Sequence, residues 1–252
     1  MGIILAIANQ KGGVGKTTTA INLGAALAAF ERKVLLVDCD PQGNATRGIG
    51  ERAGPQHLYH ALSGDCTLES VARATVFPNL DLVPADRDLV GVEVEFVGNP
   101  GWEQRLKNNL ESVVGRYDYI LLDCPPSLGH LTVGALSAAD GVVVPLQCEY
   151  FALEGVSELV ATVRRVQGGL NPRLAITGIL LTMYDDRTNL SRDIVDEIRR
   201  HFGDRVFKTI VPRNVRLAEA PSHGKPVIQY DIKCRGAEAY LALGREILGR
   251  AA

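Results

Sequence analysis

The residues Ala8-Asn9-Gln10-Lys11-Gly12-Gly13-Val14-Gly15-Lys16-Thr17-Thr18 follow directly on the apolar run Ile3-Ile4-Leu5-Ala6-Ile7. The apolar run predicts a short buried strand, and a helix is expected to begin at Thr17. Between them, three glycines let the backbone curl so that its N–H groups and the helix N-terminus face one anion. The stretch is therefore predicted to bind phosphate through Gly12, Gly13, Val14, Gly15, Lys16, Thr17 and Thr18.

Two side chains of this stretch indicate which phosphate compound it binds. Lys16 would reach the β and γ phosphates of a nucleoside triphosphate, and the Thr17 hydroxyl would complete the shell of a bridging Mg²⁺ ion. A turn that only joins a strand to a helix would explain the glycines but not the lysines and threonines. The general pattern has a glycine six residues before the second lysine, where this chain has Gln10.

The form Lys-Gly-Gly-Val-Gly-Lys-Thr-Thr resembles the deviant Walker A motif of the ParA/MinD family of ATPases, whose signature is an additional lysine, here Lys11. The resemblance extends from Ile3 to about Gly236. It implies an α/β fold with a mostly parallel twisted sheet flanked by helices, and Mg²⁺-dependent hydrolysis of ATP. We expect one such domain over residues 1–252, with no N-terminal helix-turn-helix extension and no sequence-specific repressor activity.

Composition is consistent with one large α/β domain, because 46% of the 252 residues are apolar and can form a sizeable core. No apolar stretch is long enough to cross a bilayer, and no secretory leader precedes the first strand, so we expect a cytosolic protein. The five cysteines are scattered singly, which indicates buried reduced thiols rather than a zinc site or a disulfide scaffold.

Further elements follow from the apolar pattern. Trp102 is interpreted as a core anchor rather than a base-stacking residue. Helices are predicted over 19–29, 102–114 and 235–252, strands over 33–37, 80–84, 119–123, 142–146 and 175–182, and short helices with loops over 48–79.

Two aspartates follow the strand 33–37, in the segment Asp38-Cys39-Asp40-Pro41-Gln42-Gly43-Asn44. Ligands of open α/β sheets bind at the carboxyl ends of the strands, so both carboxylates are predicted to face the phosphates. A carboxylate there can position the attacking water, and the residues alone do not decide which one does so. The segment resembles the family pattern, which implies a catalytic role for Asp40, with Lys11 and Lys16, and a place for Asp38 in the metal's water shell.

The strand Tyr119-Ile120-Leu121-Leu122 ends in Asp123 and is followed by Cys124-Pro125-Pro126-Ser127. This segment resembles a Walker B motif with the start of the family's second switch loop. The resemblance implies that Asp123 holds Mg²⁺ through water, opposite Thr17.

The string from Gln147 to Gly155 also resembles the family, in which the glutamate matching Glu149 lies near the nucleotide at a dimer interface. A carboxylate that caps the following helix is the alternative interpretation, and the residues leave both open. By resemblance, two later loops contribute to an adenine pocket through Met183, Pro212, Arg213 and Asn214.

Charge is divided unevenly along the chain. Residues 1–163 carry 11 Lys and Arg against 19 Asp and Glu, and residues 164–252 carry 16 against 10, so the net charges are −8 and +6. The basic portion suits a polyanion, but composition alone favours ordinary solvated helix faces. Arg187 and Arg216 lie in strings that resemble the chromosomal ParA/Soj branch, which implies sequence-independent DNA binding; Lys225 and Lys233 are possible additions.

The resemblance implies a nucleotide switch. Two subunits enclose two ATP molecules, Lys11 of each reaches the phosphates held by the other, and the homodimer binds nucleoid DNA non-specifically. A ParB-like centromere-binding partner then stimulates hydrolysis, which drives segregation of a chromosome or plasmid. We expect a cytoplasmic, nucleoid-associated protein.

Two alternatives remain. A MinD-like membrane-cycling ATPase would end in a basic amphipathic helix, but in 235–252 three arginines are offset by Glu238 and Glu246, so no membrane partner is expected. An iron-sulfur carrier related to nitrogenase iron protein would need cysteines from two subunits; Cys124 lies close to Asp123, but no second cysteine has a suitable context.

Overall fold

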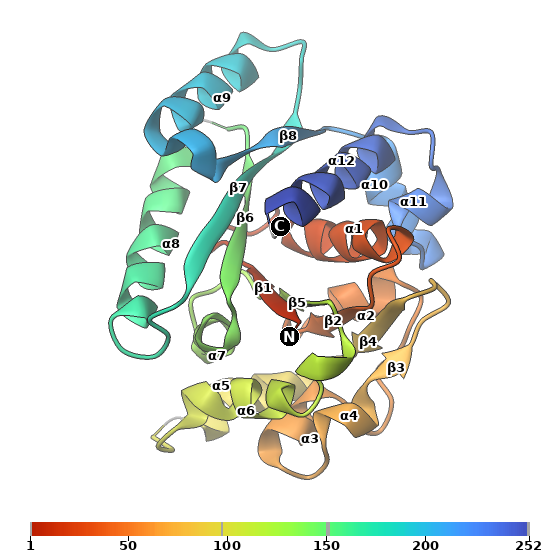
Figure 1. The fold of residues 1–252 in the computed structure, drawn as a ribbon, viewed down its shortest axis with the longest axis vertical. Coiled ribbons are helices and arrows are strands. Elements are labelled where there is room, and N and C mark those ends of the chain that lie inside the picture. Colours follow the sequence, from red (N-terminus) through yellow and green to blue (C-terminus); the bar gives the residue numbers. More distant parts are fainter. Residues whose placement is uncertain (1, 97, 150–151, 251–252) are drawn as a thin grey trace.

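The computed structural model describes residues 2–96, 98–149 and 152–250, which form one sheet covered by helices on both faces (Figure 1). The eight described strands are ordered β3-β4-β2-β5-β1-β6-β7-β8, and all neighbours are parallel except β3 and β4. The strands are β1 (Ile3–Ile7), β2 (Val34–Asp38), β3 (Arg73–Ala74), β4 (Leu80–Val83), β5 (Tyr119–Asp123), β6 (Gly141–Gln147), β7 (Ala175–Tyr184) and β8 (Val206–Pro212). The predicted fold class is confirmed.

The helices form two layers, with α1 and α10 to α12 packed on one face and α3 to α9 on the other (Figure 1). The α-helices are α1 (Lys16–Ala29), α2 (Asn44–Gly48), α3 (Leu58–Ser63), α4 (Leu68–Val71), α5 (Gly91–Glu95), α6 (Arg105–Glu111), α7 (His130–Ala138), α8 (Ala152–Gln167), α9 (Asn189–Phe202), α10 (Val215–Glu219), α11 (Val227–Tyr230) and α12 (Arg235–Arg250). Short 3₁₀ helices are η1 (Arg87–Val90), η2 (Trp102–Gln104), η3 (Val114–Arg116), η4 (Gly203–Arg205) and η5 (Ala220–His223).

Strand β1 lies inside the sheet, between β5 and β6. Its side chains alternate between the two cores, Ile4 and Ala6 facing one and Leu5 and Ile7 the other. Such burial on both faces is what an unbroken apolar run in a parallel sheet requires. The register sets Ile7 and Asp38 each opposite Asp123, so the segments after β1, β2 and β5 leave the sheet at one edge.

The predicted helix over 102–114 is wrong as a single element, because η2, α6 and η3 divide it. α6 ends at Glu111, just before the β-branched pair Val113-Val114 and Gly115, residues that favour a helix less than its leucines do. Trp102 packs against the core as predicted.

All five cysteines are free, and Cys66 alone is only partly buried.

Helix α12 packs on α1 and β8 through Tyr240, Leu243 and Ile247, which are buried. This agrees with the interpretation of residues 235–252 as a helix packed on the domain. None of the described helices has the length and apolar character needed to span a membrane.

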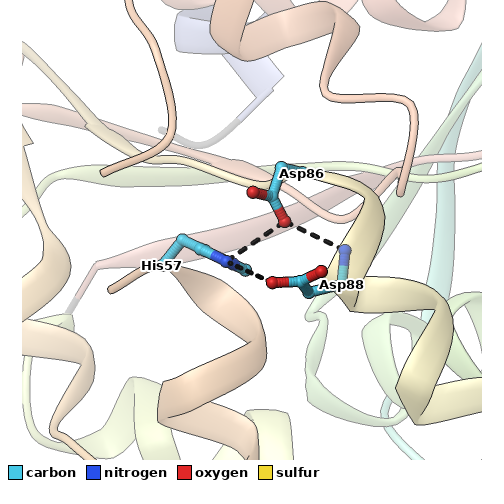
Figure 2. Close-up of side chains that lie close together, drawn as sticks. All are labelled: His57, Asp86 and Asp88. Carbon is cyan, nitrogen blue, oxygen red and sulfur yellow. Dashed lines mark hydrogen bonds and ion pairs between the residues drawn. The ribbon is translucent and has the colours of Figure 1, made fainter. Parts of the chain in front are cut away.

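His57, at the start of α3, joins this helix to the segment after β4 (Figure 2). Its Nε2 atom lies 3.1 Å from Asp86 Oδ1 and 3.8 Å from Asp88 Oδ2. Burial lowers the pKa of His57, and the nearby His60 acts in the same direction, while Asp86 and Asp88 oppose them. The folded protein therefore favours the neutral imidazole.

We expect the free energy of unfolding to fall as the pH drops below about 6.5, because the unfolded chain then binds a proton that folded His57 resists. The contribution is at most about 1.4 kcal/mol per pH unit. In His57→Asn, which puts a residue favoured at helix N-caps in this place, denaturant unfolding between pH 7 and 5.5 should show a smaller loss of stability. Parallel curves for the two proteins would contradict this assignment.

Candidate nucleotide-binding site

The phosphate loop, residues 8–18, is held from both sides by polar side chains. Asn9 donates from Nδ2 to the Pro145 carbonyl at 2.7 Å and accepts from the Lys11 N–H at 3.0 Å. On the other side, Thr182 in β7 donates from Oγ1 to the Val14 carbonyl at 2.9 Å. The loop is therefore fixed to β6 and β7 before any ligand binds.

Two glycines give this loop its turn. Gly13 has φ +75° and Gly15 has φ +90°, conformations that favour glycine. Gly15 is also the N-cap of α1, and no side chain caps that helix. The first N–H groups of α1 thus lack an intrahelical partner and face the loop, an arrangement that suits an anion.

The two lysines of the loop have different environments. Lys16 is buried, and its Nζ donates to the Lys11 carbonyl at 2.9 Å. Burial lowers the pKa of Lys16, although Asp123, Cys124 and Asp40 oppose that shift. The side chain of Lys11 is 40% exposed and lies 3.1 Å from Glu149 Oε2. Gln147 donates to the other oxygen of Glu149, so this carboxylate holds Lys11 within the same chain.

Asp38 and Asp40 are both buried at the end of β2. Asp38 accepts from the Thr46 N–H at 2.8 Å and from the Thr46 hydroxyl at 2.7 Å, which shapes the turn into α2. Burial raises the pKa of Asp38 to about 6. Asp40 accepts from the Gln42 N–H at 2.9 Å. Asp38 therefore has structural partners, and its place in a metal's water shell stays a prediction, as does the catalytic role of Asp40.

Asp123 is fully buried, and neither of its carboxylate oxygens has a hydrogen-bond partner within the described residues. Burial raises the pKa of Asp123 well above its ordinary value, and the nearby Asp38 adds to the shift, while Thr17 and Lys16 oppose it. A buried carboxylate without a partner is costly. Its oxygens and the Thr17 hydroxyl form a hard donor set of the kind that Mg²⁺ prefers.

A cavity of about 240 Å³ opens beside the phosphate loop. It brings together all four residues predicted for the adenine pocket, and its lining is Gly15, Thr18, Thr182, Met183, Val211, Pro212, Arg213, Asn214, Leu217, Ala218 and Tyr240. Met183 belongs to β7 rather than to a loop, as does Tyr184, and has φ +52°, a strained conformation for a residue other than glycine. The cavity is large enough to receive a planar base.

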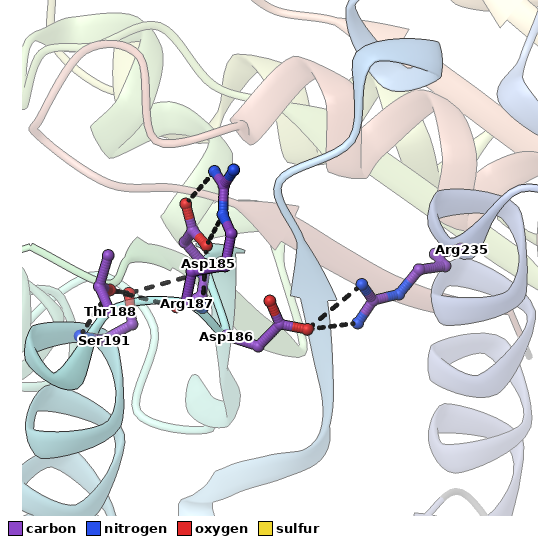
Figure 3. A network of polar contacts seen from close by, with 6 residues as sticks. All are labelled: Asp185, Asp186, Arg187, Thr188, Ser191 and Arg235. Carbon is purple, nitrogen blue, oxygen red and sulfur yellow. Dashed lines mark hydrogen bonds and ion pairs between the residues drawn. The ribbon is translucent and has the colours of Figure 1, made fainter.

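The predicted DNA-binding arginines are exposed but paired with carboxylates. Arg187, whose side chain is 81% exposed, donates to both oxygens of Asp185 at 2.9 and 2.7 Å (Figure 3). This pairing holds the pKa of Asp185 well below its usual range. Arg216 lies 2.8 Å from Glu219 and 3.3 Å from Asp231.

The ion pair of Arg235 and Asp186 lies between the segment that carries Arg187 and the segment that pairs with Arg216. Arg235, at the start of α12, lies 3.4 Å from Asp186, the neighbour of Arg187 (Figure 3). Arg235 also follows closely on Asp231, the partner of Arg216. Lys225 and Lys233 are exposed. The segment after β7, α10 and the start of α12 thus present basic side chains with matching carboxylates.

Some residues of the site escaped sequence reasoning. Thr182 and Tyr240 line the cavity, yet each lies in an apolar segment that predicts only core. Asn9 had a weak signal, since it is the polar residue that ends an apolar run. Glu149 pairs with Lys11 of the phosphate loop, and its capping of the following helix stays a prediction. The string after it includes Tyr150 and Phe151, which lie outside the described residues.

Comparisons with known proteins agree with this geometry. Residues 2–176 match the family model AAA_31, described as an AAA domain. The chain is 57% identical over 249 residues to the sporulation initiation inhibitor protein Soj of Bacillus subtilis (strain 168), covering 98% of each. It is 55% identical over 251 residues to the chromosome partitioning protein ParA of Caulobacter vibrioides (strain NA1000 / CB15N), covering 98% of this chain and 94% of the relative.

One solved structure, cobyrinic acid a,c-diamide synthase from Mycobacterium smegmatis with bound ADP and magnesium, has a TM-score of 0.87 and 38% identity, covering 98% of this chain and 94% of that one. The fold, the phosphate loop and the buried Asp123 together define a nucleotide-binding ATPase of the deviant Walker A class. Within that class, the chain belongs to the ParA/Soj family of chromosome-partitioning ATPases, as the more identical relatives show.

Proposed function

We propose that this chain is a partitioning ATPase whose ATP-bound form dimerises, binds DNA without sequence preference and is released when a ParB-like partner stimulates hydrolysis. The observation that carries the nucleotide part is the unpartnered, buried carboxylate of Asp123, set at the same edge of the sheet as a glycine-rich loop whose helix has no cap. The phosphate loop suits the anionic phosphates of ATP, and the Asp123 carboxylate beside it suits Mg²⁺.

ATP is the substrate and Mg²⁺ the metal of this reaction. The N–H groups from Gly12 to Thr18 and the ammonium of Lys16 hold the phosphates, Thr17 and Asp123 hold the metal, and the cavity at Met183, Pro212, Arg213 and Asn214 receives the adenine. When bound, Mg²⁺ neutralises charge that develops on the phosphates. Asp40 orients the water, and Asp38 serves the metal's water shell while it bonds Thr46.

The dimer depends on Lys11. Its ammonium pairs with Glu149 of its own chain at 3.1 Å, and both side chains are about half exposed, so this pair is weak. A triphosphate carries more negative charge than one carboxylate, and a closed interface would exclude water. Lys11 therefore leaves Glu149 for the phosphates held by the second subunit, and the dimer requires the γ-phosphate.

DNA binding depends on Arg187 and Arg216, with Lys225 and Lys233 as further contacts. Each arginine must exchange a carboxylate of its own chain for a DNA phosphate, which limits the affinity of a single subunit. Two subunits joined by ATP neutralise more phosphates at once, so the dimer binds more tightly. This places the protein on the nucleoid in its ATP form.

We expect DNA co-sedimentation with ATP but little with ADP, and an affinity that falls steeply between 50 and 200 mM salt. Arg216→Ala should weaken binding and reduce the slope of log affinity against log salt by about 1 for each DNA phosphate that it leaves without a cation. Arg173→Ala, an exposed arginine near the opposite ends of the strands, serves as control. Equal binding with ATP and ADP would contradict the coupling.

A further inference from the structure

Helix α7 begins without a cap of its own. Its N-cap residue is Gly129, which has no side chain to accept from the first N–H groups of the helix. Those groups are satisfied instead by Glu93, from α5. Glu93 Oε2 accepts from the His130 N–H at 2.9 Å, and Oε1 accepts from the Leu131 N–H at 3.1 Å.

The contact is built closely on both sides. Glu93 Oε2 also lies 2.9 Å from His130 Nδ1. A Cβ atom at position 129 would lie 2.7 and 2.8 Å from the two carboxylate oxygens, so a side chain there would force the Glu93 carboxylate to move. Burial alone would raise the pKa of Glu93, but the hydrogen bonds from Leu131 and His130 outweigh it and lower the pKa. The carboxylate is thus ionised where the positive end of the helix dipole lies.

The loop that begins at the nucleotide site, after β5, ends where helix α7 begins. Asp123 ends β5, and residues 124–129 lead from it to α7. Pro126 borders the phosphate loop, since a Cβ atom at Gly12 would lie 3.9 Å from its Cβ. Thr132 donates to the Ser127 carbonyl at 2.6 Å and so ties the loop to the first turn of α7.

The segment that carries Glu93 is itself fixed. At one end, His57 pairs with Asp86 and Asp88 (Figure 2). At the other end, the Tyr59 hydroxyl donates to Glu95 Oε2 at 2.7 Å. The buried Leu89, Val92 and Phe96 hold the segment in the core.

We propose that Glu93 is a positioning residue of the ATPase site: by capping α7 from a fixed helix, it sets the loop of residues 124–129 against the phosphate loop. The inference rests on the proposed ATPase function of this site. Losing the cap loosens the start of α7, and the loop with it. The phosphate loop, anchored by Asn9 and Thr182, is unaffected. Hydrolysis therefore falls while ATP binding persists.

Glu93→Gln removes the charge and turns an amide N–H₂ group toward the N–H groups of α7. We expect the single-turnover rate of ATP hydrolysis to fall about 10- to 100-fold, as misplaced catalytic groups do, and the Kd for ATP to stay within about twofold. Glu95→Gln is the matched control, because it makes the same change on the same helix, away from α7, and its amide oxygen still accepts from the Tyr59 hydroxyl; it should behave as wild type.

Trp102, the only tryptophan, gives a second readout. Its ring lies 4.3 Å from that of His130, so its emission reports on the start of α7. In Glu93→Gln, but not in Glu95→Gln, the emission without nucleotide and its change on adding ATP should differ from wild type. A variant with altered emission that still hydrolyses ATP at the wild-type rate would overturn the proposal.

Gly129→Ala tests the same contact without changing charge, should Glu93→Gln fold poorly. Its methyl group displaces the carboxylate, so the rate and the emission should change in the same directions. Wild-type hydrolysis by a folded Gly129→Ala would also overturn the proposal. A wild-type protein that neither binds nor hydrolyses ATP would instead refute the proposed function itself.

Discussion

Lys11→Ala is expected to abolish the ATP-dependent dimer while the single subunit still binds ATP within a few-fold of wild type. The side chain of Lys11 makes one half-exposed ion pair with Glu149, and its loss should cost the fold less than about 1 kcal/mol. The carbonyl that accepts from Lys16 belongs to the backbone and stays in place. In the dimer, by contrast, two ammonium groups would be removed from a closed, charged interface.

The expected loss is at least about 100-fold in dimer affinity, since each charge-assisted hydrogen bond contributes roughly 1.5–3 kcal/mol. Sedimentation velocity with a non-hydrolysable ATP analogue measures it, and DNA binding with ATP should drop to the level seen with ADP. Lys107→Ala, which removes an exposed lysine of α6, is the control. A Lys11→Ala protein that dimerises and binds DNA as wild type does would refute the proposal that Lys11 reaches the phosphates held by the second subunit.

Asp123→Asn is expected to lower Mg²⁺-dependent ATP hydrolysis by about 100-fold or more while it leaves the unliganded fold as stable as wild type, or more stable. A neutral amide is less costly to bury than a carboxylate without a partner, and the repulsion from Asp38 disappears. If Asp123 holds the metal as proposed, the same change also removes a ligand charge from the Mg²⁺ site.

The pH dependence of Tm tests the effect of Asp123→Asn on stability separately from its effect on hydrolysis. Because burial raises the pKa of Asp123 above 3.8, the folded protein binds its proton more tightly than the unfolded chain does. This carboxylate therefore destabilises the fold at neutral pH, and the penalty disappears as the pH falls toward 4. The gain in Tm of Asp123→Asn over wild type should accordingly be largest near pH 7.

Binding of Mg²⁺ and ATP gives the second measurement. Together they should raise the Tm of the wild type more than ATP with a chelator does, and Asp123→Asn should lack this magnesium-dependent part. Asp81→Asn is the control and should keep it, because the Asp81 carboxylate in β4 accepts from the Tyr117 hydroxyl instead. An Asp123→Asn protein with the full magnesium-dependent rise would exclude this carboxylate from the metal site.

The sequence predicted the site best where a local pattern of residues fits only one kind of structure. Glycines between two lysines after an apolar run predicted the phosphate loop, and aspartates after apolar strands predicted which strands end beside it. The parallel sheet then brought Asp38 and Asp123 into register. The four residues that family resemblance assigns to an adenine pocket line one cavity.

The rest depends on tertiary contacts that a local pattern does not encode. Glu93 alternates with valines in the segment Gly91–Glu95, a pattern that does not point to α7, and its contact appears only because the fold brings it to the start of that helix. The residues around Glu149 allow two interpretations, and its pairing with Lys11 of the phosphate loop appears only in the fold. Tertiary packing also placed Met183 in β7 with a positive φ, where the sequence indicated an ordinary loop.

The position of β1 in the sheet has a consequence for how this chain is made. The ribosome synthesises β1 first, yet its two neighbours, β5 and β6, come from much later in the chain, with Ile3 beside Tyr119 and Leu5 beside Gly141. Until both have emerged, the nascent chain carries an apolar strand with two open edges, which invites aggregation. Nucleotide can therefore bind, and stabilise the fold, only late in translation.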